Sequence, residues 1–135
     1  MSAVGTPDFN TIWLPHTYAW SGAAAVASGA TSYLPPFFMP VPPGQTATLV
    51  GVWTLCRAGS MTGHIQQSQN AGALTTVAGL DSLTFSQTSA FFACSGWQEV
   101  FDGDYFAPVL DSVASTPDGF TVTFVVAYQL DPAFV

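Results

Sequence analysis

The stretch Phe120-Thr-Val-Thr-Phe-Val-Val-Ala-Tyr-Gln-Leu130 decides the fold class of this chain. Large apolar side chains stand at alternate positions along it, and a period of two is typical of a β-strand with one face against a core. Thr116-Pro-Asp-Gly119 directly precedes it and predicts a turn, because proline presets φ and glycine takes the left-handed position. The side chains expected on the core face are those of Phe120, Val122, Phe124, Val126 and Tyr128, opposite Thr121 and Thr123.

A second region of strand character begins at Thr46 and predicts a long strand that ends at Cys56. Apolar groups on both of its faces indicate that both sides are covered. Arg57-Ala-Gly-Ser60 predicts a turn, so we expect Met61 to Gln66 to pair with the preceding strand as a hairpin, with Met61 and Ile65 inward. On the long strand, Leu49, Trp53 and Leu55 are expected on one face and Val50, Val52 and Cys56 on the other, with Trp53 in the core.

Further strands are predicted over residues 80–86, 89–94 and 105–113, where Pro108 indicates an edge or a bulge. Turn signals recur at roughly the 8–12-residue spacing of sandwiches and barrels, and no long helical period is present. The sequence therefore predicts an all-β chain: an antiparallel β-sandwich, jelly-roll-like, of about seven or eight strands.

Residues 33–135 are assigned to the β-sandwich domain and residues 1–32 to an irregular N-terminal arm. Asp8 to Leu14 could form a short strand, but Pro15 interrupts it. The small-residue segment 21–29 has no amphipathic pattern. We therefore expect the arm to hold at most short structure.

The amino-acid composition favours a protein that assembles with other protein chains over a monomer. Apolar residues make up 49% of the chain and charged residues only 7%, against roughly 25% charged residues in ordinary globular chains. There is no lysine, Arg57 is the single arginine, and the net charge is −7. Nucleic acid and anionic membranes are excluded as partners, because both are bound through cations. No apolar run approaches the length of a membrane span, and no secretory signal is expected.

No arrangement of residues predicts catalysis, so the chain is predicted not to be an enzyme and to need no cofactor. Glu99, Asp102 and Asp104 could ligate Ca²⁺, but a solvated turn at Asp102-Gly-Asp104 is the favoured interpretation. His16 and His64 lie far apart in sequence without a nucleophile motif near either.

The two cysteines, Cys56 and Cys94, are too far apart for a zinc or redox motif. Two buried free thiols are favoured, and a disulfide between neighbouring strands is the alternative.

Binding surfaces remain, and the Pro-rich segment 33–43 is the first of them. We expect it to be a stiff strap laid on a neighbouring subunit or on the sandwich's open edge; the alternative is that it covers the domain's own core. A second hypothesis places a ligand platform, for example for a sugar, at Trp97 with Tyr105. The side chains predicted for the interface are those of Trp13, Tyr18, Trp20, Tyr33, Phe37, Phe38 and Met39.

The segment Tyr33-Leu-Pro-Pro-Phe-Phe-Met-Pro-Val-Pro-Pro-Gly-Gln-Thr46 resembles the PPFFxPVPxGQT opening motif of small virion proteins of tailed actinobacterial phages. The similarity extends over residues 33–130. This chain departs from the pattern in its scarcity of basic residues and in residues 1–32. Four later stretches are also similar to their sandwich module: Gly63-His-Ile-Gln-Gln67, Gly79-Leu-Asp-Ser-Leu83, Asp102-Gly-Asp104 and Thr116-Pro-Asp-Gly-Phe-Thr-Val-Thr-Phe124.

The resemblance implies a minor tail or accessory component of a virion, made in the bacterial host cytoplasm, whose partners are other virion proteins. A homo-oligomer, with a trimer as the expected symmetry, agrees with the low charge. The alternatives are a capsid decoration protein and a module at the tail tip that binds a receptor or carbohydrate. The resemblance brings no functional residues with it.

Overall fold

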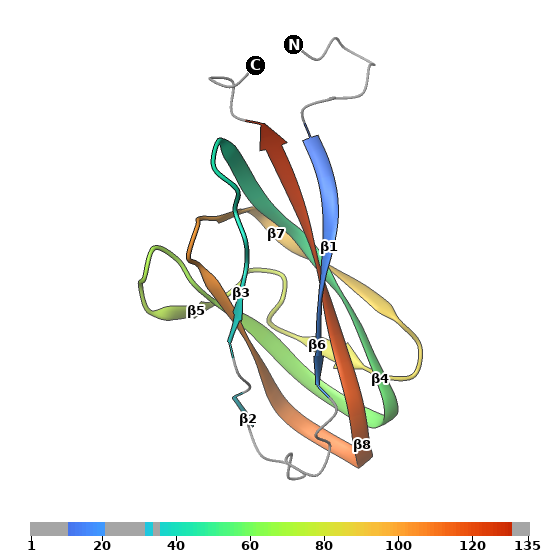
Figure 1. Cartoon of the computed structure of the whole chain (residues 1–135). Helices are drawn as coiled ribbons and strands as arrows, with labels where there is room; N and C mark the ends of the chain where they lie inside the picture. The colour runs from blue at the N-terminus through green and yellow to red at the C-terminus, as the bar shows by residue number, and fades with distance from the viewer. Residues whose placement is uncertain (1–10, 21–31, 34–35, 131–135) are drawn as a thin grey trace.

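Eight antiparallel strands and no helix make up the part of the chain that the structure describes, which is residues 11–20, 32–33 and 36–130 of this computed structural model (Figure 1). The all-β prediction is confirmed. The strands are β1 Thr11–Trp20, β2 Ser32–Tyr33, β3 Phe37–Phe38, β4 Gln45–Ser68, β5 Leu74–Thr76, β6 Leu83–Phe85, β7 Ala90–Val100 and β8 Tyr105–Leu130.

The two long strands, β4 and β8, pair with each other from end to end, from Gln45 opposite Leu130 to Ser68 opposite Tyr105. Figure 1 shows this two-stranded ribbon doubling back on itself at a corner. On β4 the corner lies at the register shift between Ala58 and Ser60, where Gly59 has a φ of 70°. The segments predicted as turns at 57–60 and 116–119 both lie at this corner.

The predicted hairpin between residues 46–56 and 61–66 is wrong. Both stretches belong to β4, and each pairs with a different half of β8. The chain does change direction after Cys56, but β8 bends beside it, so the ladder between the two strands continues through the bend. A sequence signal for a turn cannot distinguish a hairpin from such a shared bend, because both need the same backbone angles.

The doubled ribbon gives the fold two layers. The first layer runs β1, β8 (120–130), β4 (45–56) and β7. The second layer holds β2 and β3, β8 (105–114), β4 (60–68), and then β5 and β6. Aromatic rings join the layers: Phe106 lies 5.1 Å from Phe124, and Phe85 lies 5.6 Å from Phe120. This arrangement confirms the predicted β-sandwich.

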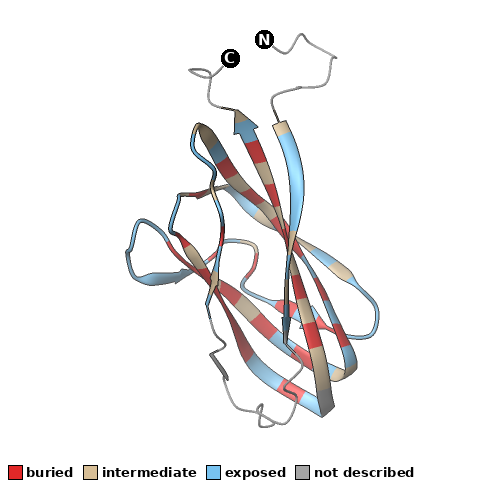
Figure 2. Cartoon of the chain, viewed as in Figure 1, coloured by how far each residue is buried: buried red, intermediate tan, exposed pale blue. Residues whose placement is uncertain are grey.

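The core lies between the layers, and Figure 2 shows buried positions alternating with more exposed ones along β4 and β8. The predicted inward residues of β8 are all buried, as are Met61 and Ile65 of β4. The side chains that are completely buried and largest in volume include Phe85, Phe106, Phe124, Met39, Leu49, Ile65, Leu80, Leu83 and Leu110.

The predicted faces of the first half of β4 need a correction. Leu49 and Val52 are both buried, whereas Trp53 and Leu55 are 45% and 39% exposed. The register shifts between Leu49 and Gly51, so Val50 is an extra residue in the ladder. A bulge of one residue exchanges the two faces beyond it, and the prediction of Trp53 as a core residue is therefore wrong.

Residues Thr11–Trp20 also differ from the expected irregular arm, because they form β1, which pairs with β8 over ten positions. Pro15 lies inside this strand, opposite Val125. Within the described chain β1 pairs only with β8, and proline is tolerated in strands at such an edge. The rest of the predicted arm, 1–10 and 21–31, lies outside the described residues.

Candidate interaction surface

The outward side of the first layer, named here the outer face, gathers large apolar side chains that are not covered by the second layer. In register across it lie Thr17, Thr123 and Trp53, and four residues further along β1 and β8 lie Trp13 and Ala127. The exposed large apolar side chains on this face are those of Trp13, Trp53, Leu55, Phe91 and Trp97. Exposed aromatic side chains in a contiguous patch are typical of interaction sites.

A ridge of two aromatic rings lies on β4 and β7, toward the corner end of the outer face. Trp53 of β4 and Phe91 of β7 are cross-strand partners, and their ring centroids lie 5.2 Å apart. Next to the ridge, the hydroxyl groups of Thr17 and Thr123 are hydrogen bonded at 3.2 Å. Both aromatic rings remain 40% or more exposed, so their contact with each other leaves much apolar surface open.

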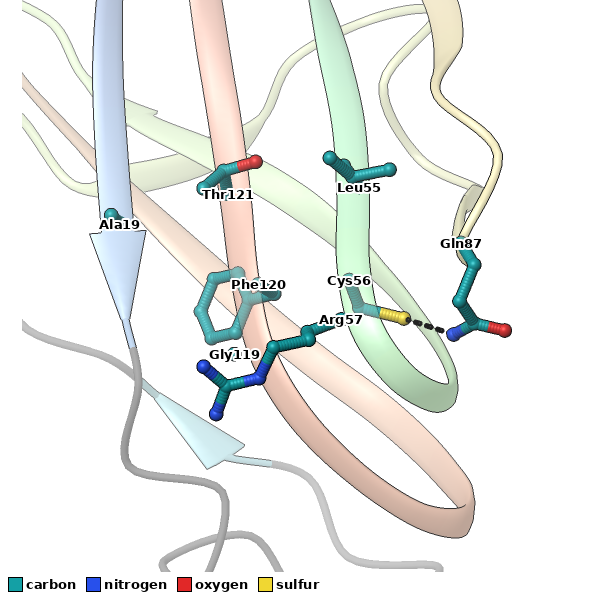
Figure 3. Close-up of a pocket in the computed structure, with 8 residues that line it drawn as sticks. All are labelled: Ala19, Leu55, Cys56, Arg57, Gln87, Gly119, Phe120 and Thr121. Carbon is teal, nitrogen blue, oxygen red and sulfur yellow. Dashed lines mark hydrogen bonds between the residues drawn. The ribbon is translucent and has the colours of Figure 1, made fainter.

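Three hollows accompany the ridge. One of about 560 Å³ has Trp13 and Trp97 on its border. A second, of about 340 Å³, lies beside Trp53 between Ser89 and Thr121. The third, of about 470 Å³, lies near the corner of the fold, where Figure 3 shows β1, β8, β4 and the segment that carries Gln87 around it. Protruding rings and hollows thus alternate on one face.

The single cation of the chain stands at the corner end of this face. The Arg57 guanidinium is ion-paired with the Asp118 carboxylate, with a distance of 3.0 Å from Nε to Oδ2. Its charge is thereby compensated locally. The half-buried Glu99 lies at the other end, opposite Thr48. Between these two ends, none of the described residues of the outer face is charged.

The other described carboxylates lie elsewhere. Asp104 is buried, and Asp81 and Asp102 lie in loops. On the second layer, the Asp111 carboxylate lies 2.8 Å from His64 Nδ1. The negative charge of the described chain is therefore concentrated away from the outer face.

The two histidines occupy separate sites. His64 Nδ1 contacts Asp111, and His16 Nε2 contacts the Tyr128 hydroxyl at 2.8 Å. Burial lowers the pKa of His16. The Tyr128 hydroxyl also donates to the carbonyl of Pro40 at 2.8 Å, so it holds the Pro-rich segment to β8.

The acidic turn at Asp102-Gly-Asp104 joins neighbouring segments of the fold through hydrogen bonds. Asp102 is exposed, whereas the Asp104 carboxylate points inward and accepts hydrogen bonds from three nitrogen atoms. Among the described residues no group of three histidine, cysteine or acidic side chains is placed to hold a metal ion. The same part of the chain contains no helical segment with the length and hydropathy of a membrane span.

The two cysteines are not bonded to each other. Cys56 is buried beneath the corner hollow, and the Gln87 side-chain nitrogen lies 3.5 Å from its sulfur (Figure 3). Cys94 is half-buried on β7 beside the hollow between Trp13 and Trp97. Burial raises the pKa of the Cys94 thiol to about 11.

We expect alkylation of Cys94 by iodoacetamide at pH 8 to be on the order of a hundredfold slower than that of an unhindered thiol, because only the thiolate reacts. The rate should rise about tenfold per pH unit and level off only near pH 11. Peptide mass mapping of the labelled site across pH measures this. The urea-unfolded chain is the control; a plateau below pH 9 in the folded chain would contradict the assignment.

The residues predicted for the interface have different environments. Trp13 and Phe38 are both 62% exposed. Met39 is buried, and Phe37 stacks on Phe124 with centroids 5.4 Å apart. Tyr18 packs against the core through Phe37 and Phe120. Trp20 and Tyr33 end β1 and β2, and their side chains lie outside what the structure describes.

The Pro-rich segment lies along the sandwich's open edge, where Phe37 and Phe38 pair with Phe106 and Tyr105 of β8. It also covers the domain's own core through Phe37 and Met39. Of its aromatic side chains with a described environment, Phe38 alone projects, and it packs against Tyr105 with centroids 5.4 Å apart. Trp97, at 76% exposed, has Trp13 on the far side of its hollow. The structure thus gives Trp97 and Tyr105 different neighbours.

Comparison with known proteins detects no matching family model and no curated relative. Solved structures with a similar arrangement of strands include the following three. A chain from Bacillus endospore appendages, a novel family of disulfide-linked pili, has a TM-score of 0.45 and 11% identity over 97% of this chain and 98% of its own. A chain of the cyanophage Pam1 capsid asymmetric unit has a TM-score of 0.42 and 16% identity, over 96% and 93%. A chain of infectious bursal disease virus, Gx strain, has a TM-score of 0.37 and 12% identity, over 93% and 38%. At these scores the likeness concerns the arrangement of strands only.

Proposed function

We propose that this chain is a structural virion protein of a tailed bacteriophage, a minor tail or other accessory component. The outer face carries the proposal: exposed rings of Trp13, Trp53, Phe91 and Trp97 stand on a sheet whose middle bears no charge. Burying such a face under protein is favourable by about 25 cal/mol per Å². Only 7% of the chain is charged, which suits a protein that is largely covered in a particle.

The resemblance of residues 33–130 to small virion proteins of actinobacterial phages supports the same role. On this proposal the chain sits on the tail, and the alternative position is the capsid surface, as a decoration protein. In both positions its partners are other virion proteins.

Mass spectrometry of purified phage particles tests the proposal. We expect the chain to be present in intact particles in a fixed number of copies, and electron microscopy with a labelled chain should locate it on the tail or on the capsid. Presence in the infected cell together with absence from purified particles would contradict the proposal. A capsid location would replace the tail assignment while keeping the structural role.

A module that binds carbohydrate at the tail tip is the second candidate, and one observation favours it. The hollow of about 560 Å³ lies between Trp13 and Trp97, and its lining includes the polar side chains of Thr48 and Gln129. Indole faces and neutral hydrogen-bonding groups suit sugar rings. Binding on a glycan array that is lost in Trp97→Ala would support this function, and the absence of any bound glycan would remove it.

A further inference from the structure

We infer that the partner of the outer face is a second copy of this chain, packed face to face about a two-fold axis that passes through this face. This inference rests on the proposed structural function and names the partner that it requires. The occupant is argued from charge, shape and size.

The distribution of charge favours the outer face as the contact with a second copy of the chain. Each copy has a net charge of −7, so two copies repel each other wherever their carboxylates meet. The outer face offers an approach on which Arg57 is compensated by Asp118 and the middle is neutral. On the second layer, by contrast, Asp111 is 42% exposed in its side chain. A cationic partner would instead be drawn to the acidic loops, away from this face.

Shape indicates a two-fold contact. A surface that meets its own copy about a two-fold axis must be complementary to itself, and therefore carries both its protrusions and the recesses that receive them. The outer face has this property: Trp53 and Phe91 protrude, and the hollows of about 340 and 470 Å³ lie on the same sheet between them and the corner. A trimer would need two different complementary patches on each copy.

Size is sufficient for a stable pair. Four strands at about 4.8 Å spacing and ten residues at about 3.4 Å each give a face of roughly 19 by 34 Å, or about 650 Å² in projection. The protruding rings add accessible area to this, and standard interfaces bury about 800 Å² on each partner. Face-to-face packing of sheets is also an ordinary mode of β-structure. Trp53, whose exposed ring packs against Phe91, is the expected hot spot.

Sedimentation equilibrium of the purified chain tests the inference. We expect a mass of twice 14.2 kDa for the wild type. Trp53→Lys places a charge in the apolar contact and should raise the dissociation constant by at least about thirtyfold. Phe38→Lys is the matched control, because it adds the same charge in place of another exposed ring on the second layer, and it should leave the mass unchanged. Circular dichroism checks that both variants fold.

Three results would overturn the inference. The wild type could remain single at the highest concentration reached, or it could form a trimer. The third is an oligomer that Phe38→Lys dissociates and Trp53→Lys does not, which would move the contact to the Pro-rich segment. A monomeric chain that is nevertheless found in purified virions would end the two-fold contact and leave the proposed function standing, whereas absence from virions bears on the function itself.

Discussion

Replacing Phe124 with alanine is expected to lower the free energy of unfolding by about 3–5 kcal/mol. Phe124 is 0% exposed. Its ring lies 5.1 Å from Phe106 on the other layer and 5.4 Å from Phe37 of the Pro-rich segment. Alanine removes both contacts and leaves a cavity where the two layers and this segment meet, and closely packed surroundings collapse only partly into such a space. Urea unfolding followed by far-ultraviolet circular dichroism measures the change.

Two variants calibrate this result. Phe124→Leu should cost about 1–2 kcal/mol, because leucine refills most of the space. Phe38→Ala removes the same ring from a site that is 62% exposed and should cost less than about 1 kcal/mol. Equal losses in Phe124→Ala and Phe38→Ala would mean that the layers do not pack together through Phe124, and the two-layer arrangement would be wrong.

The strands with one face in the core could be predicted from the sequence because alternation reports that face directly. This is true of Phe120–Leu130 and of Met61 and Ile65, whose inward positions are confirmed. Alternation does not report pairing. The bend that β4 and β8 share could not be distinguished from two separate turns, since which strand continues beside a turn depends on contacts distant in sequence.

The outward position of Trp53 is not predicted by alternation because Val50 is the extra residue of a β-bulge between β4 and β8. One signal was available: Gly51 lies inside a predicted strand, and a glycine there often marks a bulge or a close backbone approach. The structure shows the approach, since a Cβ at Gly51 would lie 2.4 Å from the carbonyl oxygen of Phe92. Reading the bulge from Gly51 would have turned Trp53 outward.

Individual residues of the candidate surface could be predicted from the sequence, but not which of them lie together. The sequence predicts an interface role for Trp13 and a ligand platform at Trp97. Their common hollow depends on the order β1, β8, β4, β7, which sets two strands between them. Strand order follows from the summed packing of the whole sheet, so no local pattern in the sequence contains it.

Replacing Asp104 with alanine is the other change with a large expected effect, a loss of about 3–5 kcal/mol in the free energy of unfolding. Asp104 is 1% exposed. Its carboxylate accepts hydrogen bonds from the backbone N–H of Phe101 at 2.8 Å, the backbone N–H of Asn70 at 2.8 Å and the side-chain nitrogen of Gln67 at 3.2 Å. These bonds hold the turn before β8 to the end of β4 and to the loop after it.

Alanine would remove the acceptor of the part-buried backbone N–H groups of Phe101 and Asn70, and one of the two acceptors of the buried Gln67 side-chain nitrogen, which also donates to the carbonyl of Glu99 at 3.0 Å. Unsatisfied buried donors each cost about 1–3 kcal/mol. Asp104→Asn keeps one acceptor oxygen and should lose about 1–3 kcal/mol, because its amide group faces a donor with another donor. Asp102→Ala, an exposed carboxylate in the same turn, is the matched control and should change stability by less than about 0.5 kcal/mol. Denaturant unfolding of the four proteins ranks them. If Asp104→Ala were no less stable than Asp102→Ala, the buried carboxylate would not be what joins β4 to β8 at this end of the sandwich.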